Sequence, residues 1–102
     1  MPNPNYEAGR RLEFERRKFY EDAYGCTCYR SAGSHGPVDV TCIRPGEVML
    51  LQLKRVSSPA EARLLIRRFK ESPPFGHEPP KGVLQRLEGR VKGSKEILSA
   101  TV

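Results

Sequence analysis

The sequence predicts an α/β domain in which helices flank a mixed central β-sheet. Residues 5–23 carry apolar side chains at helical spacing among many charged ones. Residues 38–54 hold two apolar runs rich in β-forming residues, joined by a Pro-Gly pair, which is typical of a β-hairpin. Directly after them, residues 58–61 read Ser-Pro-Ala-Glu, a pattern that begins a helix. A chain of 102 residues supports one modest core, so we expect a single domain over residues 1–102.

The first helix is expected to begin with Asn5 as its cap and to end near Ala23, before Gly25. Glu13 lies at the border of the apolar face, where a carboxylate can lean toward the sheet. The alternative is that Glu13 only balances neighbouring arginines in i,i+4 pairs. The residues expected near the apolar face are Ala8, Leu12, Phe19 and Ala23, and those on much of the remaining surface are Arg10, Arg11, Arg16, Arg17 and Lys18.

A first strand is expected over residues 26–30, and a loop of small residues follows it. The glycines of this loop and Ser34 allow backbone N–H groups and a hydroxyl to approach a phosphate closely, and His35 supplies a further donor. The alternative is an ordinary turn between two strands. We favour DNA contact because the loop immediately precedes Asp39.

The hairpin carries the clearest chemical signal. Pro45-Gly46 suits the central positions of a type II turn. Side chains alternate along a strand, so Gln52 and Lys54 point to one side, and Asp39 on the opposite strand is expected near both. A carboxylate, an amide oxygen and an ammonium group suit phosphodiester hydrolysis, in which Asp39 binds Mg²⁺, Gln52 adds an oxygen and Lys54 orients the attacking water. The alternative is that all three are ordinary polar residues at strand positions.

The second half of the chain predicts further elements. A helix is expected over residues 59–70, an extended loop over residues 72–80, and two terminal strands around Gly93. An amphipathic helix over residues 83–91 is the alternative for the first of these strands. In the helix, the residues expected to pack on the sheet or on a second subunit are Leu64, Leu65, Ile66 and Phe69, and those facing solvent or phosphate are Arg63, Arg67, Arg68 and Lys70.

Composition favours a polyanionic partner and a reducing compartment. The formal net charge is +6, from 18 Lys and Arg against 12 Asp and Glu. The 3 cysteines lack zinc-ligand spacing, and their odd number suggests reduced thiols. No apolar stretch reaches transmembrane length and the first residues lack the apolar region of a signal peptide, so we expect an intracellular, cytoplasmic protein with no membrane association.

Three motifs, in the expected order, resemble a known family. Asp39 followed by residues 52–54 (Gln-Leu-Lys) is similar to the PD-(D/E)XK nuclease motif. Residues 9–13 resemble the Gly-x-x-x-Glu opening helix of archaeal-type Holliday junction resolvases, and residues 30–36 resemble their Ser/Gly loop before the catalytic Asp. The resemblance covers residues 5–58, which is more specific than any one motif alone.

The chain departs from the family pattern at three positions. Val38 replaces the usual Pro, Gln52 replaces the acidic residue, and Ala32 stands in the loop where the family often has Ser. The change at Gln52 removes one negative charge and is expected to weaken or alter the preference for a metal. Gln-x-Lys also occurs in other branches, notably modification-dependent restriction endonucleases, so we interpret it as a variant of the motif.

The resemblance implies a PD-(D/E)XK (restriction-endonuclease-like) fold and a homodimer that nicks opposed strands of a four-way (Holliday) DNA junction, using Mg²⁺ with Mn²⁺ as a substitute. It implies Glu13, Asp39 and Gln52 as metal ligands and Lys54 as the fourth catalytic residue. Two alternatives remain open: a restriction- or repair-type endonuclease of the same fold, and a catalytically inactive DNA-binding homologue. The residues expected to bind branched DNA are Arg10, Arg11, Arg30, Ser31, Ser34, His35 and Arg55.

Overall fold

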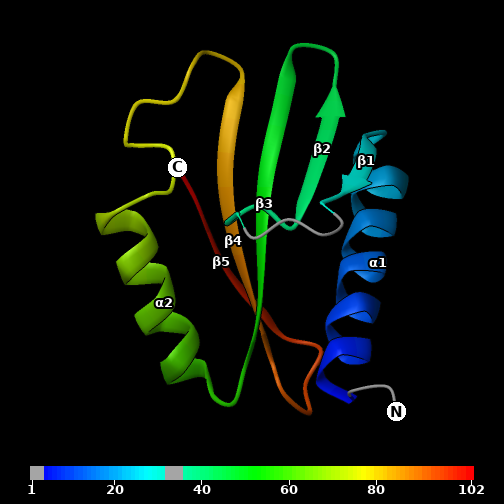
Figure 1. Ribbon diagram of the computed structural model, residues 1–102, viewed down its shortest axis with the longest axis vertical. Coiled ribbons are helices and arrows are strands. Elements are labelled where there is room, and N and C mark those ends of the chain that lie inside the picture. The colour runs from blue at the N-terminus through cyan, green and yellow to red at the C-terminus, as the bar shows by residue number, and fades with distance from the viewer. Residues whose placement is uncertain (1–3, 32–35) are drawn as a thin grey trace.

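A computed structural model describes residues 4–31 and 36–102, and these form two helices and a five-stranded mixed sheet (Figure 1). The predicted α/β class and mixed sheet are therefore confirmed. No helix in these two ranges is long and apolar enough to cross a membrane. The elements, in chain order, are α1 (Pro4–Tyr24), β1 (Thr27–Arg30), β2 (Val40–Arg44), β3 (Glu47–Val56), α2 (Pro59–Glu71), β4 (Val83–Val91) and β5 (Ile97–Thr101).

The buried face of α1 differs from the predicted one. The helix begins at Pro4, a residue suited to a first helical position, so Asn5 lies inside the first turn and the predicted cap is wrong. Leu12 and Tyr20 are both 7% exposed, whereas Phe19 is 40% exposed and Ala23 is exposed. The stripe that faces the sheet therefore runs from Leu12 to Tyr20 at i, i+4 and i+8 spacing. Its end at Tyr20 carries a hydroxyl, which donates to a buried carboxylate described below.

The first three strands form an antiparallel meander. β1 pairs with β2, and β2 pairs with β3 from Val40↔Leu51 to Arg44↔Glu47. The two-residue turn between β2 and β3 has Gly46 at φ 77°, the positive value that the third position of a type II turn requires. The Pro-Gly hairpin was thus predictable from its turn residues and its apolar flanks.

Helix α2 connects two parallel strands. β3 and β4 pair in parallel from Val48↔Val83 to Val56↔Val91, and a crossover through α2 supplies the length that such a connection needs. The Ser58 hydroxyl accepts the N–H of Glu61 at 3.2 Å, as predicted. The Glu61 carboxylate, however, accepts from the backbone and hydroxyl of the preceding Ser57.

The terminal strands and the packing of α2 complete the sheet. Residues 83–91 are a strand, not the alternative helix, and β5 pairs antiparallel with β4 at the edge. Ala62 and Phe69 form the buried face of α2. Leu64 is 37% exposed, so of its two predicted positions the one on this sheet is wrong, and packing on a second subunit stays a prediction. Gly89 permits the close approach of α2, because a Cβ built there would lie 3.3 Å from the Cβ of Ala62.

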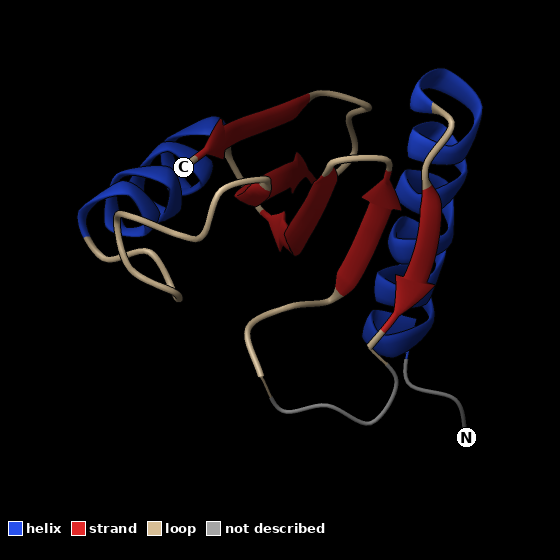
Figure 2. Cartoon of the chain, turned by 90° about the horizontal axis from the view of Figure 1, so that it is seen from above, coloured by secondary structure: helices blue, strands red, loops and turns tan. Residues whose placement is uncertain are grey.

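The two helices cover different parts of opposite sheet faces. α1 contacts β1, β2 and β3, whereas α2 contacts β3, β4 and β5 (Figure 2). Leu51 of β3 packs in the cluster that contains Tyr20 of α1, and Val56, of opposite parity along the strand, packs with Ala62 of α2. β3 therefore packs against α1 with one face and against α2 with the other.

Candidate active site

The Asp39 carboxylate lies where the β2–β3 ladder ends. Beyond Val40↔Leu51, the backbone N–H of Leu53 donates to Asp39 Oδ2 at 2.7 Å instead of to a backbone carbonyl. The Asp39 backbone is held from both sides, since its N–H donates to the Leu51 carbonyl and its carbonyl accepts from the Ser31 N–H, both at 2.9 Å. The carboxylate is thereby held against the backbone of β3 at Leu53. Asp39 is not among the described residues that line the pocket of Gln52 and Lys54, so its predicted proximity to those two side chains stays a prediction.

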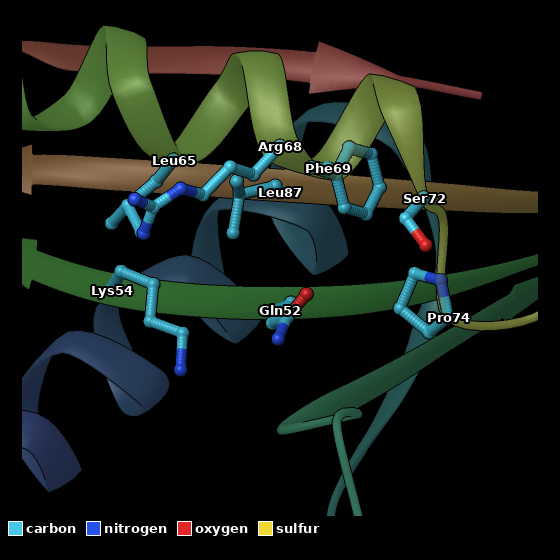
Figure 3. A pocket seen from close by; sticks show the side chains of 8 residues that line it. All are labelled: Gln52, Lys54, Leu65, Arg68, Phe69, Ser72, Pro74 and Leu87. Carbon is cyan, nitrogen blue, oxygen red and sulfur yellow. The ribbon is translucent and has the colours of Figure 1, made fainter.

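Gln52 and Lys54 line one pocket of about 320 Å³ on the face that α2 covers (Figure 3). Both extend from β3, and the Arg68 side chain extends from α2 toward the side of the pocket where Lys54 lies. None of the described residues that line this pocket carries a carboxylate, so Lys54 and Arg68 make it electropositive. The remaining lining residues are Leu65, Phe69, Ser72, Pro74 and Leu87.

The wall beside Gln52 is held in place by a buried amide. Gln85 is 1% exposed, and its Oε1 accepts the Phe75 N–H while its Nε2 donates to the Gly76 carbonyl, both at 2.8 Å. These bonds satisfy both ends of the amide and anchor the segment after α2, where we predicted an extended loop. Pro74, next to the anchored Phe75, is thereby kept at the pocket edge.

Glu13 has a partner other than the predicted one. Its Oε2 accepts from Nε of Arg30 at 2.6 Å, and this hydrogen bond is the first cause of the raised pKa of Arg30. Arg30 pairs with Val40, which packs in the core beneath α1, so its side chain points toward α1 and Glu13. Glu13 of α1 is thus bonded to β1 on the face that α1 covers. Among the described residues it contacts neither of the other predicted metal ligands, Asp39 and Gln52, through a hydrogen bond, and it forms no ion pair with an i,i+4 arginine.

The other predicted DNA-binding residues do not lie at one site. Arg10 stacks over the exposed Tyr6 ring, with its Cζ 5.7 Å from the ring centroid. Arg11 and Arg55 line one hollow together. Ser34 and His35 lie outside the described residues, while Ser31 contributes the backbone bond to Asp39.

The predicted metal ligands are oxygen donors of the kind that Mg²⁺ prefers. Asp39 has one carboxylate oxygen bonded to the Leu53 N–H, and Gln52, the residue before Leu53 on β3, carries an amide oxygen and lines the pocket with Lys54. Within residues 4–31 and 36–102, no group of three or more His, Cys, Asp and Glu side chains is placed to hold a metal. An ion at Asp39 and Gln52 would therefore depend on water and substrate oxygens for the rest of its shell, which suits Mg²⁺.

A buried charge cluster on the other face escaped sequence analysis. Glu88 of β4 is 1% exposed and accepts from Arg16 Nε at 2.7 Å, Tyr20 Oη at 2.5 Å and Arg86 Nε at 2.9 Å. Burial alone raises the pKa of Glu88, but these hydrogen bonds outweigh it and hold the pKa below its usual range. Burial and the bond to Glu88 raise the pKa of Tyr20 to about 12.

The fold defines the chain as an α/β protein with a five-stranded mixed sheet between two helices. No protein-family model matches the chain, and no curated protein sequence matches it either.

Proposed function

We propose that the chain is a metal-dependent endodeoxyribonuclease with a PD-(D/E)XK-type fold that nicks four-way DNA junctions as a homodimer. The observation that supports this best is the hydrogen bond from the Leu53 N–H to the Asp39 carboxylate. It brings the carboxylate of the motif to the strand that bears Gln52 and Lys54. The mixed sheet flanked by helices also agrees with the fold that the motif implies.

Each polar group has a role in phosphodiester hydrolysis. Asp39 and Gln52 would hold Mg²⁺, which when bound supplies charge neutralisation and an activated water. Lys54 orients the attacking water and stabilises negative charge on the phosphate as it forms. Arg68 approaches the same pocket from α2 and adds a second cation for that charge.

The charge of the chain suits recognition of DNA shape. The net charge of +6 favours phosphate contacts, which position DNA without reading its sequence. We therefore expect salt-sensitive binding with weak sequence dependence.

The deciding experiment is cleavage of an end-labelled synthetic four-way junction beside a linear duplex of the same sequence, with Mg²⁺, with Mn²⁺ and with chelator. Paired symmetric nicks in the junction alone support the proposal. Cutting of the linear duplex instead assigns the chain to the restriction or repair type. Junction binding without cutting in either metal contradicts nuclease activity.

A second candidate is a DNA-binding homologue that has lost catalysis. Two observations favour it: Gln52 stands where the motif has an acidic residue, and the Glu13 carboxylate is paired with Arg30 at 2.6 Å. The substitution Gln52→Glu separates the two candidates. An active nuclease keeps or increases its cleavage rate with this substitution, whereas an inactive homologue shows cleavage only after the carboxylate is restored.

A further inference from the structure

A hollow of about 220 Å³ lies on the α1 side of the sheet and is lined by arginines from three elements. Arg11 comes from α1, Arg55 from β3 and Arg90 from β4. The rest of the lining is Ala8, Leu12 and Glu15. Three separate elements thus direct guanidinium groups toward a single concave site.

The charges in this hollow are not balanced. Glu15 is the one carboxylate among the described residues that line the hollow, and it pairs with Arg90, with Arg90 Nη2 at 2.5 Å from Glu15 Oε2. Three guanidinium groups against one carboxylate leave two positive charges. In addition, Arg90 Nε is buried and has no hydrogen-bond partner in the part of the chain that the structure describes. A buried donor of this kind is costly unless an acceptor reaches it, and phosphate oxygens match guanidinium geometry well.

The hollow and the candidate active site lie on opposite sides of the sheet. Arg55 directly follows Lys54 on β3, so their side chains point to opposite faces. Lys54 lines the pocket beneath α2, while Arg55 lines the hollow beside α1. A straight duplex lying along one face reaches only one of these sites, whereas bent or branched DNA reaches both around the end of the sheet.

We propose that Arg11, Arg55 and Arg90 form a phosphate-binding site for a DNA backbone segment other than the one at Lys54. This assignment of DNA as the ligand rests on the proposed nuclease function. The site selects bent or branched DNA over straight duplex because only the former places phosphates on both faces. Glu15 competes with phosphate for Arg90 and so moderates the affinity.

The test compares Arg55→Gln, Arg90→Gln and Glu15→Gln with the control Lys81→Gln, an exposed residue before β4 that lines neither site. Binding to labelled junction and linear duplex is measured in chelator over a range of salt. We expect each arginine variant to lose roughly fivefold to tenfold in junction affinity and about one in the slope of log affinity against log salt. Duplex affinity should change less.

Glu15→Gln should change affinity in the opposite direction. It removes the intramolecular partner of Arg90 but keeps all three arginines, so the junction should bind more tightly. A gain in affinity cannot arise from unfolding, which keeps the test valid if Arg90→Gln folds poorly.

Each result bears on a different proposal. If both arginine variants match Lys81→Gln in affinity and slope, the hollow is not a phosphate site. Equal losses on junction and duplex overturn the assignment to a second backbone segment. If the unsubstituted chain never cleaves DNA but the expected binding changes occur, the nuclease proposal fails and the phosphate site stands. If the unsubstituted chain cleaves the junction but the arginine variants bind it as tightly as Lys81→Gln does, the phosphate-site proposal fails and the nuclease proposal stands.

Discussion

At the residue scale, Asp39 both holds the backbone of β3 in place and is a proposed metal ligand. Its carboxylate accepts the Leu53 N–H at the point where the strands stop pairing through their backbones. One oxygen is therefore occupied in fixing the side chain, and the carboxylate keeps further lone pairs that can accept from a water or bind a metal. This geometry predicts that neutralising Asp39 changes chemistry more than structure, because an amide oxygen still accepts the same bond.

We expect Asp39→Asn and Lys54→Ala to reduce junction cleavage by at least about a hundredfold while leaving junction affinity within about threefold, since in the proposed mechanism both residues act at the reacting phosphate. Single-turnover cleavage and gel-shift binding measure the two effects separately. Glu47→Gln, a change of one charge at the distant hairpin turn, is the control. Substantial metal-dependent cutting by either purified variant would count against the assigned site.

Arg68 offers a second comparison at this scale, because a neighbour on α2 provides a matched control. Arg68 lines the pocket of Gln52 and Lys54, whereas Arg67 lines a different hollow with Arg63 and Lys70. We expect Arg68→Ala to slow cleavage by roughly tenfold to a hundredfold through lost charge stabilisation. Arg67→Ala should change the rate much less. Equal rates for the two variants would remove Arg68 from the site.

The candidate site was partly predictable because its central geometry is local. Asp39, Gln52 and Lys54 belong to one hairpin, and alternation along β3 together with the turn at Gly46 determines their relation. The partner of Glu13 and the position of Arg68 depend on how helices dock on the sheet. Spacing within the sequence carries no information about that docking.

At the element scale, the contact between α1 and β4 depends on Glu88. Arg16 and Tyr20 come from the helix, and Arg86 comes from β4 itself. The helical spacing of apolar residues placed Phe19 near the apolar face of the first helix. The Arg16 guanidinium instead lies over the Phe19 ring, 4.3 Å from its centroid, at the rim of the cluster. The sequence did not decide whether residues 83–91 form a strand or a helix, so the buried position of the Glu88 carboxylate could not be predicted from it.

Replacing Glu88 with Gln should lower the free energy of unfolding by about 3 kcal/mol, because the arginines lose a buried counter-charge. Urea denaturation at neutral pH measures this loss. Glu61→Gln, at the exposed start of α2, serves as a control and should cost much less. A Glu88→Gln variant as stable as the unsubstituted protein would show that the cluster adds no net stability.

The same cluster predicts the direction of the pH dependence. A carboxyl whose pKa is lower in the folded state contributes stability above its ordinary pKa of 4.5, and this contribution is lost as the pH falls through the folded pKa. We therefore expect stability to fall at acid pH more steeply in the unsubstituted protein than in Glu88→Gln. Parallel curves of unfolding free energy against pH would contradict the assignment.

At the scale of the whole molecule, the proposed paired nicks require two active sites in one complex. Each chain supplies one Asp39, so a homodimer of about twice 11.5 kDa would present two. Mixed dimers of unsubstituted and Asp39→Asn chains should therefore nick one strand of a junction and leave the opposed strand intact. Nicked and fully resolved products separate on native gels, and full resolution by purified mixed dimers would contradict the two-site arrangement.

The Glu88 cluster also has a consequence for the order of folding. Its bonds from Arg16 and Tyr20 span 72 and 68 residues, so they close a loop of most of the chain. The β2–β3 hairpin, by contrast, joins neighbouring segments, and local contacts of this kind form rapidly. During synthesis β2, which directly follows Asp39, and β3, which carries Lys54, can therefore pair early, whereas α1 gains its full docking contacts only after β4 has left the ribosome.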